Sequence, residues 1–426
     1  MATTARFVSR ITRNTLAMVL AGGRGTRLKM LTNWRAKPAM PFGGKFRIID
    51  FALSNCINSG VRKVYVLTQY KSHSLIGHLL RGWNFLRSET GEFVELIPAQ
   101  QWVDEDAWYE GTADAVYQSL DIIAENAPQY VLILAGDHVY KMDYGEMLAS
   151  HVASGADFTI ACHVVPVAQA SDFGVMAVDQ DYRITDFVEK PGEPPTLPND
   201  PDAALISMGI YVFSFDYLLE HLLRDAADPE SNHDFGKDII PYAVRNKHFV
   251  QAYSFSTSEI GNGYWRDVGT LDAYYETNME LLELESALDL YNRDWRIFTY
   301  QEQLPSAKFV GSGDLGRIQH SMVSGGCVIR NSVIEDSILF SNVQIGEQCD
   351  LQGVVALPDC QIGNRVRLRR VMLDKGCVLA DDTCIGEDPD ADARRFYRTE
   401  SGIVVVNREM LGQELRYLPS DTSYQR

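Results

Sequence analysis

Residues 16–28 read Leu-Ala-Met-Val-Leu-Ala-Gly-Gly-Arg-Gly-Thr-Arg-Leu, and they decide the fold of the first two thirds of the chain. The five apolar residues that open the stretch predict a short buried strand. The glycines that follow let the backbone turn sharply and approach a phosphate group without a Cβ clash. The loop is not a P-loop, because no Gly-Lys-Ser/Thr follows at the required distance. It is not a dinucleotide-binding fingerprint either, because the last glycine of the pattern Gly-x-Gly-x-x-Gly is missing. With Arg24, Arg27 and Lys37 close behind, it predicts a binding site for a nucleoside triphosphate.

Up to about residue 285, the chain alternates short β-branched runs with helical patterns. Buried strands are predicted at residues 16–20, 64–67, 131–134, 158–165 and 184–188. One amphipathic helix is predicted from the spacing of Ala113, Val116, Leu120 and Ile123. This alternation predicts an α/β domain with a mainly parallel sheet and helices on both faces. Because such sheets bind ligands beyond the carboxyl ends of their strands, motifs at those ends carry the functional prediction.

Past residue 305 the period of the apolar residues changes to six. A strict spacing of six joins Val333, Leu339, Ile345, Leu351 and Leu357. A spacing of five or six continues through Ile362, Leu368, Leu373, Leu379 and Ile385. This period predicts a left-handed parallel β-helix of hexapeptide turns, whose inward side chains stack into one core. We therefore expect a catalytic domain at residues 1–288, a linker at 289–305 and a β-helix domain at 306–426.

The composition of the chain limits the kinds of partner and the cell compartment that we expect for the protein. The chain has 426 residues and 57 Asp plus Glu against 39 Lys plus Arg, a net charge of −18 that disfavours nucleic acid and anionic membranes. No run of 18 apolar residues predicts a membrane span, and the N-terminus lacks the apolar core of a secretory signal, so we expect a cytoplasmic protein. The seven cysteines include no CxxC pair, and we expect the five in the last quarter to be apolar fillers of the β-helix.

Three charged positions stand out by their place in the sequence. Asp137 directly follows the predicted strand at 131–134, where it suits a metal-binding carboxylate, although an Asp that caps the next helix is the alternative. The pair Glu189-Lys190 ends the strand at 184–188, where a solvated charge pair is the simplest interpretation. Asp267 lies in Tyr-Trp-Arg-Asp-Val-Gly, a segment equally compatible with a surface turn.

The loop Leu-Ala-Gly-Gly-Arg-Gly-Thr-Arg-Leu resembles the signature loop of nucleotide-sugar pyrophosphorylases. Longer stretches are similar to bacterial ADP-glucose pyrophosphorylases, namely residues 42–60, 108–114, 131–140, 207–213 and 264–270. The similarity runs from about residue 16 to 412. It implies a Rossmann-like catalytic domain of the GT-A type and the Mg²⁺-dependent reaction of ATP with glucose 1-phosphate. The products are ADP-glucose for α-glucan synthesis and diphosphate.

The resemblance also implies roles for single residues. The implied catalytic groups are Asp137, Arg27 and Lys37, and the implied metal ligands are Asp137 and Asp267. Nucleotide contacts are implied at Leu20, Gly22, Gly23, Arg24, Gly25, Thr26, Gly111 and Thr112. Glucose 1-phosphate contacts are implied at Tyr109, Gly174, Glu189, Lys190 and Ser207. Because a phosphate monoester is already ionised at neutral pH, the reaction needs no general base, and we expect His138 to play a supporting part.

The resemblance implies regulation as well. It points to a homotetramer with a sugar-phosphate or organic-acid activator, opposed by AMP or phosphate, bound where the β-helix meets the catalytic domain. The candidate cations for that site are Arg35, Arg47, Lys375 and Arg408. Relative to the enteric pattern, Trp34 replaces a Lys, Pro41 a His and Lys375 an Arg. Because an indole cannot replace an ammonium as a phosphate ligand, we expect a weak or absent response to fructose 1,6-bisphosphate.

Two other functions remain open at this stage, and a third is disfavoured. A pyrophosphorylase that uses another nucleoside triphosphate would differ only at base-contacting residues. A bifunctional enzyme with an acyltransferase β-helix would want a catalytic His there, but His320, the one His after residue 300, precedes the clear repeats, so we do not expect acyl transfer. A non-catalytic regulatory subunit would lose phosphate-loop or metal residues, whereas this chain keeps Lys37, Asp137 and Asp267.

Overall fold

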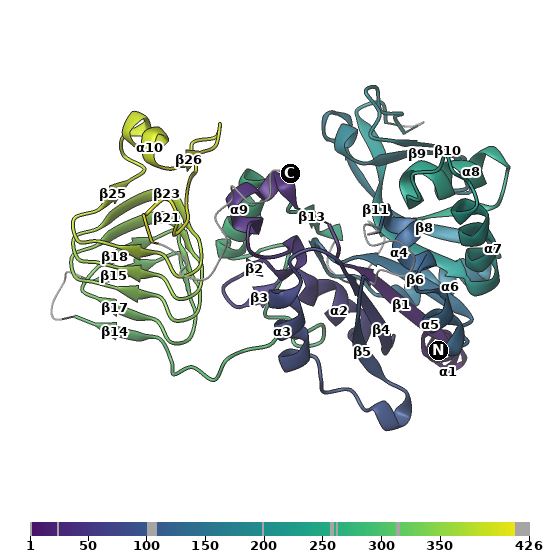
Figure 1. The fold of residues 1–426 in the computed structure, drawn as a ribbon, viewed down its shortest axis with the longest axis horizontal. Coiled ribbons are helices and arrows are strands. Elements are labelled where there is room, and N and C mark those ends of the chain that lie inside the picture. The colour runs from purple at the N-terminus through teal and green to yellow at the C-terminus, as the bar shows by residue number, and fades with distance from the viewer. Residues whose placement is uncertain are drawn as a thin grey trace.

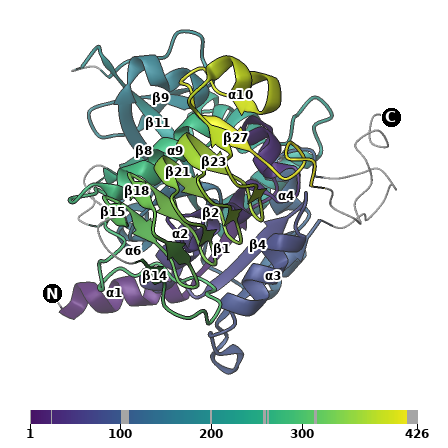
Figure 2. The same ribbon diagram turned by 90° about the vertical axis from the view of Figure 1, so that its left-hand side faces the viewer.

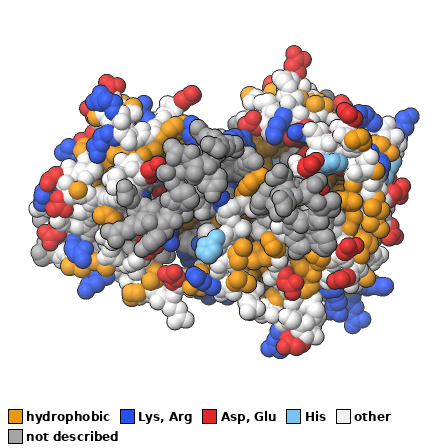
Figure 3. Space-filling model, viewed as in Figure 1, with side chains coloured by type: hydrophobic (Ala, Val, Ile, Leu, Met, Phe, Trp, Pro, Cys, Tyr) orange, Lys and Arg blue, Asp and Glu red, His pale blue; other side chains and the backbone are white. Residues whose placement is uncertain are grey.

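Two units lie side by side along the long axis of the molecule (Figure 1), an α/β domain and a β-helix. This computed structural model describes residues 2–23, 25–99, 109–197, 200–255, 260, 263–311 and 316–413. On the face shown in Figure 3, Lys and Arg are interspersed with Asp and Glu, so the negative net charge does not gather there. None of the described helices is long and apolar enough to cross a membrane.

The α/β domain is built on a nine-stranded sheet in which β10-β9-β11-β6-β1-β4-β5 are neighbours in that order, while β8 pairs with β11 and β12. Its strands are β1 (Thr15–Leu20), β4 (Lys63–Thr68), β5 (Phe93–Pro98), β6 (Tyr130–Ala135), β8 (Phe158–Pro166), β9 (Gly174–Val178), β10 (Ile184–Glu189), β11 (Ala203–Ser214) and β12 (Val250–Ser254). The central strands β6, β1, β4 and β5 are parallel, and β11 joins β6 antiparallel. The predicted strands are confirmed in β1, β4, β6, β8 and β10.

Helices cover both faces of this sheet (Figure 2), as the alternation predicts. They are α1 (Ala2–Arg13), α2 (Ile49–Asn58), α3 (His73–Gly82), α4 (Thr112–Tyr117), α5 (Leu120–Glu125), α6 (Tyr144–Ser154), α7 (Phe215–Ala226) and α8 (Ile240–Arg245), with α9 (Leu271–Met279) near the β-helix. Along β1, Ala17 and Val19 point into the core formed with α2 and α6, whereas Leu16 and Met18 point into the core formed with α4 and α7. Because successive side chains of a strand alternate between faces, one apolar strand supplies both cores.

The helix predicted from residue 113 to 123 is wrong in its continuity. All four apolar positions are buried, but the chain forms two short helices, α4 and α5, separated at Ser119. Ser119 has a non-helical backbone (φ −103°, ψ 6°), and its hydroxyl donates to the carbonyl of Ala115 at 3.0 Å. A serine that bonds back to the preceding turn competes with the helical ladder, and here it accompanies the break.

The C-terminal unit is a parallel β-helix with two long ladders of strands. One ladder is β14 (Lys308–Val310), β17 (Val328–Arg330), β20 (Gln344–Ile345), β22 (Gln361–Ile362) and β24 (Val378–Leu379). The other contains β15 (Arg317–Gln319), β16 (Met322–Val323), β18 (Val333–Glu335), β19 (Ile338–Leu339), β21 (Asp350–Ala356), β23 (Arg367–Leu373), β25 (Cys384–Ile385), β26 (Tyr397–Arg398) and β27 (Val404–Val406), and α10 (Pro389–Arg395) follows β25. Turn residues such as Asn342 and Asp359 adopt positive φ, as expected for Asn and Asp in tight turns.

Eight of the ten predicted inward residues lie in the core of the β-helix, and two predictions are wrong. Leu357 is buried, but in the apolar cluster shared with the α/β domain, and Val333 is only half-buried. In β18 the inward residue is Ile334, which pairs in register with Leu351 of the next coil. Because one residue of slip moves a side chain to the other face of a strand, the strict spacing of six fails at this first coil. All seven cysteines are free thiols, six of them buried.

The segment between the two units is firmly docked. Residues 283–307, all described, contain no helix or strand, yet Trp295 Nε1 donates to Asn55 Oδ1 at 2.9 Å and the Phe298 amide to Ser54 Oγ at 2.8 Å, both on α2. One apolar cluster also contains residues of both units, among them Phe42 and Phe340. The β-helix therefore packs against the α/β domain.

Candidate active site

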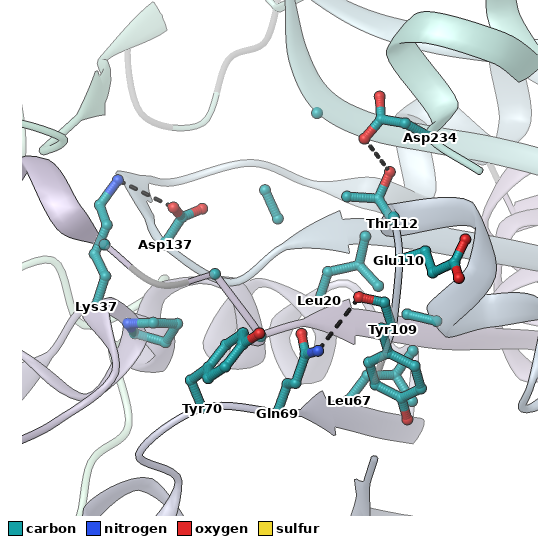
Figure 4. Close-up of a pocket in the computed structure, with 18 of the residues that line it drawn as sticks. Leu20, Lys37, Leu67, Gln69, Tyr70, Tyr109, Glu110, Thr112, Asp137 and Asp234 are labelled. Atoms are coloured by element: carbon teal, nitrogen blue, oxygen red, sulfur yellow. Dashed lines mark hydrogen bonds and ion pairs between the residues drawn. The ribbon is translucent and has the colours of Figure 1, made fainter. Parts of the chain in front are cut away.

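A cavity of about 560 Å³ opens at the carboxyl ends of β1 and β6 (Figure 4), where an α/β sheet binds its ligands. Of the residues singled out in the sequence, the lining includes Leu20, Gly22, Gly23, Gly25, Lys37, Tyr109, Gly111, Thr112 and Asp137. The glycine loop follows β1, and Asp137 follows β6. Gly111 and Thr112, at the start of α4, line another side of the cavity. The structure therefore gathers six of the eight predicted nucleotide contacts around one cavity.

The glycine loop approaches Lys37 closely. Gly25 has a left-handed backbone (φ 60°), and a Cβ built on it would lie 3.1 Å from Lys37 Cβ. The Thr32 hydroxyl closes the loop by donating to the Gly25 carbonyl at 2.9 Å. Thr26 and Arg27 are exposed at the start of the 3₁₀ segment Thr26–Thr32, beside the cavity rather than among its lining residues. The predicted contact Arg24 lies outside the described residues.

Two carboxylates and one ammonium form the charged centre of the site. Asp137 follows β6, and Asp267 ends β13 (Trp265–Asp267), which pairs antiparallel with β7 (His138–Tyr140) and so brings Asp267 opposite His138. Lys37 Nζ lies 3.0 Å from Asp137 Oδ2 and 2.5 Å from Asp267 Oδ1, and its side chain is 6% exposed. Arg27 adds a longer contact of 3.4 Å to Asp267 Oδ2.

These three groups keep one another charged. Burial acts to raise the pKa of Asp137, but the Lys37 ammonium, helped by His138, lowers it to about 2. Burial also acts to lower the pKa of Lys37, but Asp137 and Asp267 outweigh it and raise that pKa. The ammonium and the Asp137 carboxylate are therefore both ionised across the physiological range.

The donor set fits a magnesium ion. One ligand atom each from Asp137, His138 and Asp267 can be chosen so that all lie within 4.8 Å of one another, the one such group among the described residues. Mg²⁺ takes one or two carboxylates and leaves its other positions to water and substrate phosphates. His138 Nε2 lies 3.6 Å from Asp137 Oδ1, and its ring meets Trp265 edge-on at 5.0 Å. Asp137 and Asp267 would hold the ion, and His138 would support them.

Of the residues implied for glucose 1-phosphate, Tyr109 lines this cavity, whereas Gly174, Glu189, Lys190 and Ser207 are not among its lining residues. The Glu189 carboxylate approaches two glycines, since a Cβ on either Gly174 or Gly236 would lie 2.8 Å from Glu189 Oε2. Burial raises the pKa of Glu189, although Lys190, 3.6 Å away, acts to lower it. The Ser207 hydroxyl accepts from the Gly209 amide at 3.2 Å. The Glu189 carboxylate is thus flanked by the two glycines and by the exposed Lys190.

The structure adds residues that the sequence did not single out. Asp234 lines the cavity and accepts a hydrogen bond from the Thr112 hydroxyl at 3.0 Å and another from the Gly236 amide at 2.9 Å. Asp234 thus lies between Thr112, in the lining of the cavity, and Gly236, which is next to the Glu189 carboxylate. Gln69, which follows β4, donates to the Tyr109 carbonyl at 3.3 Å. The position of Gln69 directly after a strand could have marked it as a site residue, whereas no strand directly precedes Asp234.

Two of the four predicted effector cations line one cavity, and the other two lie outside it in different surroundings. Arg47 and Lys375 line a second cavity of about 240 Å³ between the two units, together with Pro41. Arg35 does not line it: its guanidinium makes a buried ion pair with Asp374 of the β-helix at 2.7 Å. Arg408 packs against Gly376, next to Lys375 in sequence but outside the lining.

The sheet, the glycine loop and the paired carboxylates define the class of a nucleotidyltransferase with an appended hexapeptide β-helix. The chain matches the Nucleotidyl transferase family over residues 16–284 and the family described as GlmU-like, C-terminal hexapeptide, over residues 305–406. Membership of the first family indicates dependence on a divalent metal ion.

Curated relatives identify the particular group. The chain is 57% identical over 417 residues to the glucose-1-phosphate adenylyltransferase of Nitrosococcus oceani, covering 97% of this chain and 98% of that protein. It is 56% identical over 419 residues to that of Methylobacillus flagellatus (97% and 98%). It is 57% identical over 413 residues to glucose-1-phosphate adenylyltransferase 2 of Alkalilimnicola ehrlichii (96% and 97%). The chain belongs to the glucose-1-phosphate adenylyltransferase family.

Proposed function

We propose that this chain transfers the adenylyl group of ATP to glucose 1-phosphate with the help of Mg²⁺, releasing pyrophosphate and forming ADP-glucose for glycogen-type synthesis. The observation that carries the proposal is the Lys37–Asp137–Asp267 centre at the glycine-loop cavity. Nearly full-length similarity to relatives named for this reaction supports the choice of substrates.

The geometry suggests how the chain promotes the reaction. An ionised oxygen of the sugar phosphate attacks the α-phosphorus in line and expels pyrophosphate, so the protein must mainly align the two substrates and offset their negative charge. Mg²⁺ held by Asp137 and Asp267 supplies part of that charge neutralisation when it is bound. The glycine loop receives the polyphosphate, and Arg27 and Lys37 stabilise the leaving pyrophosphate. Glu189 accepts from sugar hydroxyls, while Lys190 binds the sugar phosphate.

We also propose that this enzyme works as a cytoplasmic homotetramer with an anionic effector. The cavity between the two units supports the effector proposal, because Arg47 and Lys375 are joined there by Lys45 and Arg81. Trp34 is 40% exposed and is not among that lining, so the expected weak response to fructose 1,6-bisphosphate rests on the sequence comparison alone. His320, the candidate for acyl transfer, is exposed and paired with Asp336 at 2.6 Å.

The decisive assay measures pyrophosphate release from Mg·ATP and glucose 1-phosphate, with UTP in a parallel reaction. We expect rapid release with ATP, little with UTP, and a loss of about 10³-fold or more in Asp137→Asn. The result that contradicts the proposal is an absence of release with every nucleotide and effector tried, which would favour a regulatory subunit. Faster release with UTP would instead favour a pyrophosphorylase with another base preference.

A further inference from the structure

The ammonium of Lys37 occupies the place of a cation between the two metal-binding carboxylates. It contacts Asp137 Oδ2 at 3.0 Å and Asp267 Oδ1 at 2.5 Å. Its side chain is 6% exposed and that of Asp267 is 12% exposed, so water does little to screen this charge. Figure 4 shows Lys37 reaching across the cavity toward Asp137.

This position conflicts with metal binding. Asp137 Oδ2 and Asp267 Oδ1 already accept from the ammonium, and a metal ion bound to the same two carboxylates would lie close to this positive charge and be repelled by it. Arg27 does not substitute for Lys37, because its guanidinium is 54% exposed, 3.4 Å from Asp267, and shared with Asp172 at 3.7 Å. The Lys37 ammonium therefore weakens metal binding at these two carboxylates for as long as it stays between them.

The surroundings of Lys37 allow the ammonium to move and give it a destination. Its Cβ is held against the glycine loop, within 3.1 Å of a Cβ built on Gly25, and Pro38 stiffens the segment Lys37–Ala39. The three carbons beyond Cβ carry the ammonium on rotatable bonds, as in every lysine. Because both Gly25 and Lys37 line the cavity, a rotated ammonium stays beside the loop that receives the polyphosphate.

We propose that Lys37 is a place-holder cation: it neutralises Asp137 and Asp267 in the substrate-free enzyme, weakens metal binding there, and moves to the polyphosphate when the metal–nucleotide complex arrives. The metal then enters with the nucleotide rather than before it. The place of the ammonium after exchange rests on the proposed function, whereas the competition between Lys37 and the metal does not.

The test measures binding of Mn²⁺ alone to the nucleotide-free full-length chain by the loss of the free Mn²⁺ signal in electron paramagnetic resonance. In Lys37→Met, which removes the charge and keeps a similar length, we expect Mn²⁺ to bind at least about tenfold more tightly than in wild type, or about 1.4 kcal/mol. Adding Asp137→Asn to this variant should abolish the gain. The matched control is Lys190→Met, since Lys190 also pairs with a carboxylate, Glu189 at 3.6 Å, but is 62% exposed. Its Mn²⁺ affinity should stay at the wild-type value.

Thermal unfolding gives a second measure that also covers a variant that folds poorly. Lys37→Met leaves two carboxylates together without their cation, so we expect it to melt below wild type without metal and to recover when Mn²⁺ is added. Equal Mn²⁺ affinity in wild type and Lys37→Met, a gain that survives Asp137→Asn, or no rescue by Mn²⁺ would overturn the proposal. Because these assays contain no substrate, their failure is distinct from a failure of pyrophosphate release, which would overturn the proposed function.

Discussion

At the scale of single residues, Gly174 is the glycine whose substitution tests the sugar pocket most directly. A methyl group there would lie 2.5 Å from Phe187 Cζ and 2.8 Å from Glu189 Oε2, so the carboxylate must move. We expect Gly174→Ala to raise KM for glucose 1-phosphate by about tenfold while KM for ATP changes by less than about threefold. Steady-state kinetics with each substrate varied in turn measures the two effects.

The control for this substitution is Gly192→Ala, because a Cβ on Gly192 meets nothing within 4 Å. Its KM values for both substrates should stay near wild type. A Gly174→Ala enzyme with an unchanged KM for glucose 1-phosphate would remove Glu189 from the sugar site.

Residues that directly follow strands were predictable from the sequence. The glycine loop after β1 and Asp137 after β6 needed only the strand pattern and the rule that ligands bind at carboxyl ends. The pairing of Asp267 with Asp137 was not available from spacing, since it depends on the contact between β7 and β13. Asp234 was missed because it enters the site as the N-terminal cap of the segment Phe235–Ile239, where its side chain accepts from backbone amides like many other capping residues.

At the scale of elements, the β-helix depends on columns of apolar side chains. Leu351 is fully buried and lies in register between Ile334 and Leu368. We expect Leu351→Ala to lower the free energy of unfolding by about 2–5 kcal/mol through lost burial and the cavity left behind. The control is Gln352→Ala in the same strand, whose side chain is exposed and whose loss should change stability little. Urea unfolding followed by circular dichroism compares the two, and equal stability would contradict the inward assignment.

Helix α6 and strand β8 are joined by a histidine that should make the fold sensitive to acid. Burial lowers the pKa of His151 to about 4, although Asp157 acts to raise it, and His151 Nδ1 lies 2.9 Å from Thr159 Oγ1. Between about pH 6.5 and 4 the unfolded chain binds a proton at His151 that the folded chain does not, so stability falls as pH falls. When His151 is protonated in the unfolded chain but not in the folded chain, the loss of free energy of unfolding reaches about 3 kcal/mol.

Urea unfolding of wild type and His151→Gln at pH 6.5, 5 and 4 checks this prediction. Groups common to both proteins, including His163 and His221 with their pKa values also lowered by burial, cancel in the comparison. The stability of wild type should fall by about 3 kcal/mol more than that of the variant over this range. Parallel pH profiles would assign the acid sensitivity to other groups.

The spacing of apolar residues predicted which elements form more accurately than it predicted where those elements are interrupted. The period of six predicted the β-helix because each coil repeats the same inward position, yet it placed Val333 inward where Ile334 pairs with Leu351. The helical spacing from Ala113 to Ile123 predicted burial correctly and continuity wrongly, since apolar spacing does not report the bond from the Ser119 hydroxyl to Ala115. Breaks of this kind depend on local hydrogen bonds that a pattern of apolar residues does not contain.

At the scale of the whole molecule, the contact between the two units decides which cations are free to bind a ligand. The sequence placed Arg35, Arg47, Lys375 and Arg408 in one group because all were expected near the boundary. In the folded chain, Arg47 and Lys375 line the inter-unit cavity, while Arg35 is committed to Asp374. Partners separated by 339 residues are fixed only when the β-helix docks, so no local pattern predicts them.

The buried pair Arg35–Asp374 therefore predicts a coupling between the stabilities of the two units. The side chains are 10% and 6% exposed, and among the described residues the Asp374 carboxylate would keep the Lys375 amide, at 2.8 Å, as its one hydrogen-bond donor if Arg35 were removed. We expect Arg35→Met to cost about 3–5 kcal/mol, because it leaves a buried carboxylate without its cation, and Arg35→Met with Asp374→Asn to recover most of that loss. Removal of an exposed pair by Arg365→Met should change the stability little, because water screens that pair. Thermal and urea unfolding of the four proteins measures these differences, and an Arg35→Met chain as stable as wild type would show that the docking of the β-helix does not depend on this ion pair.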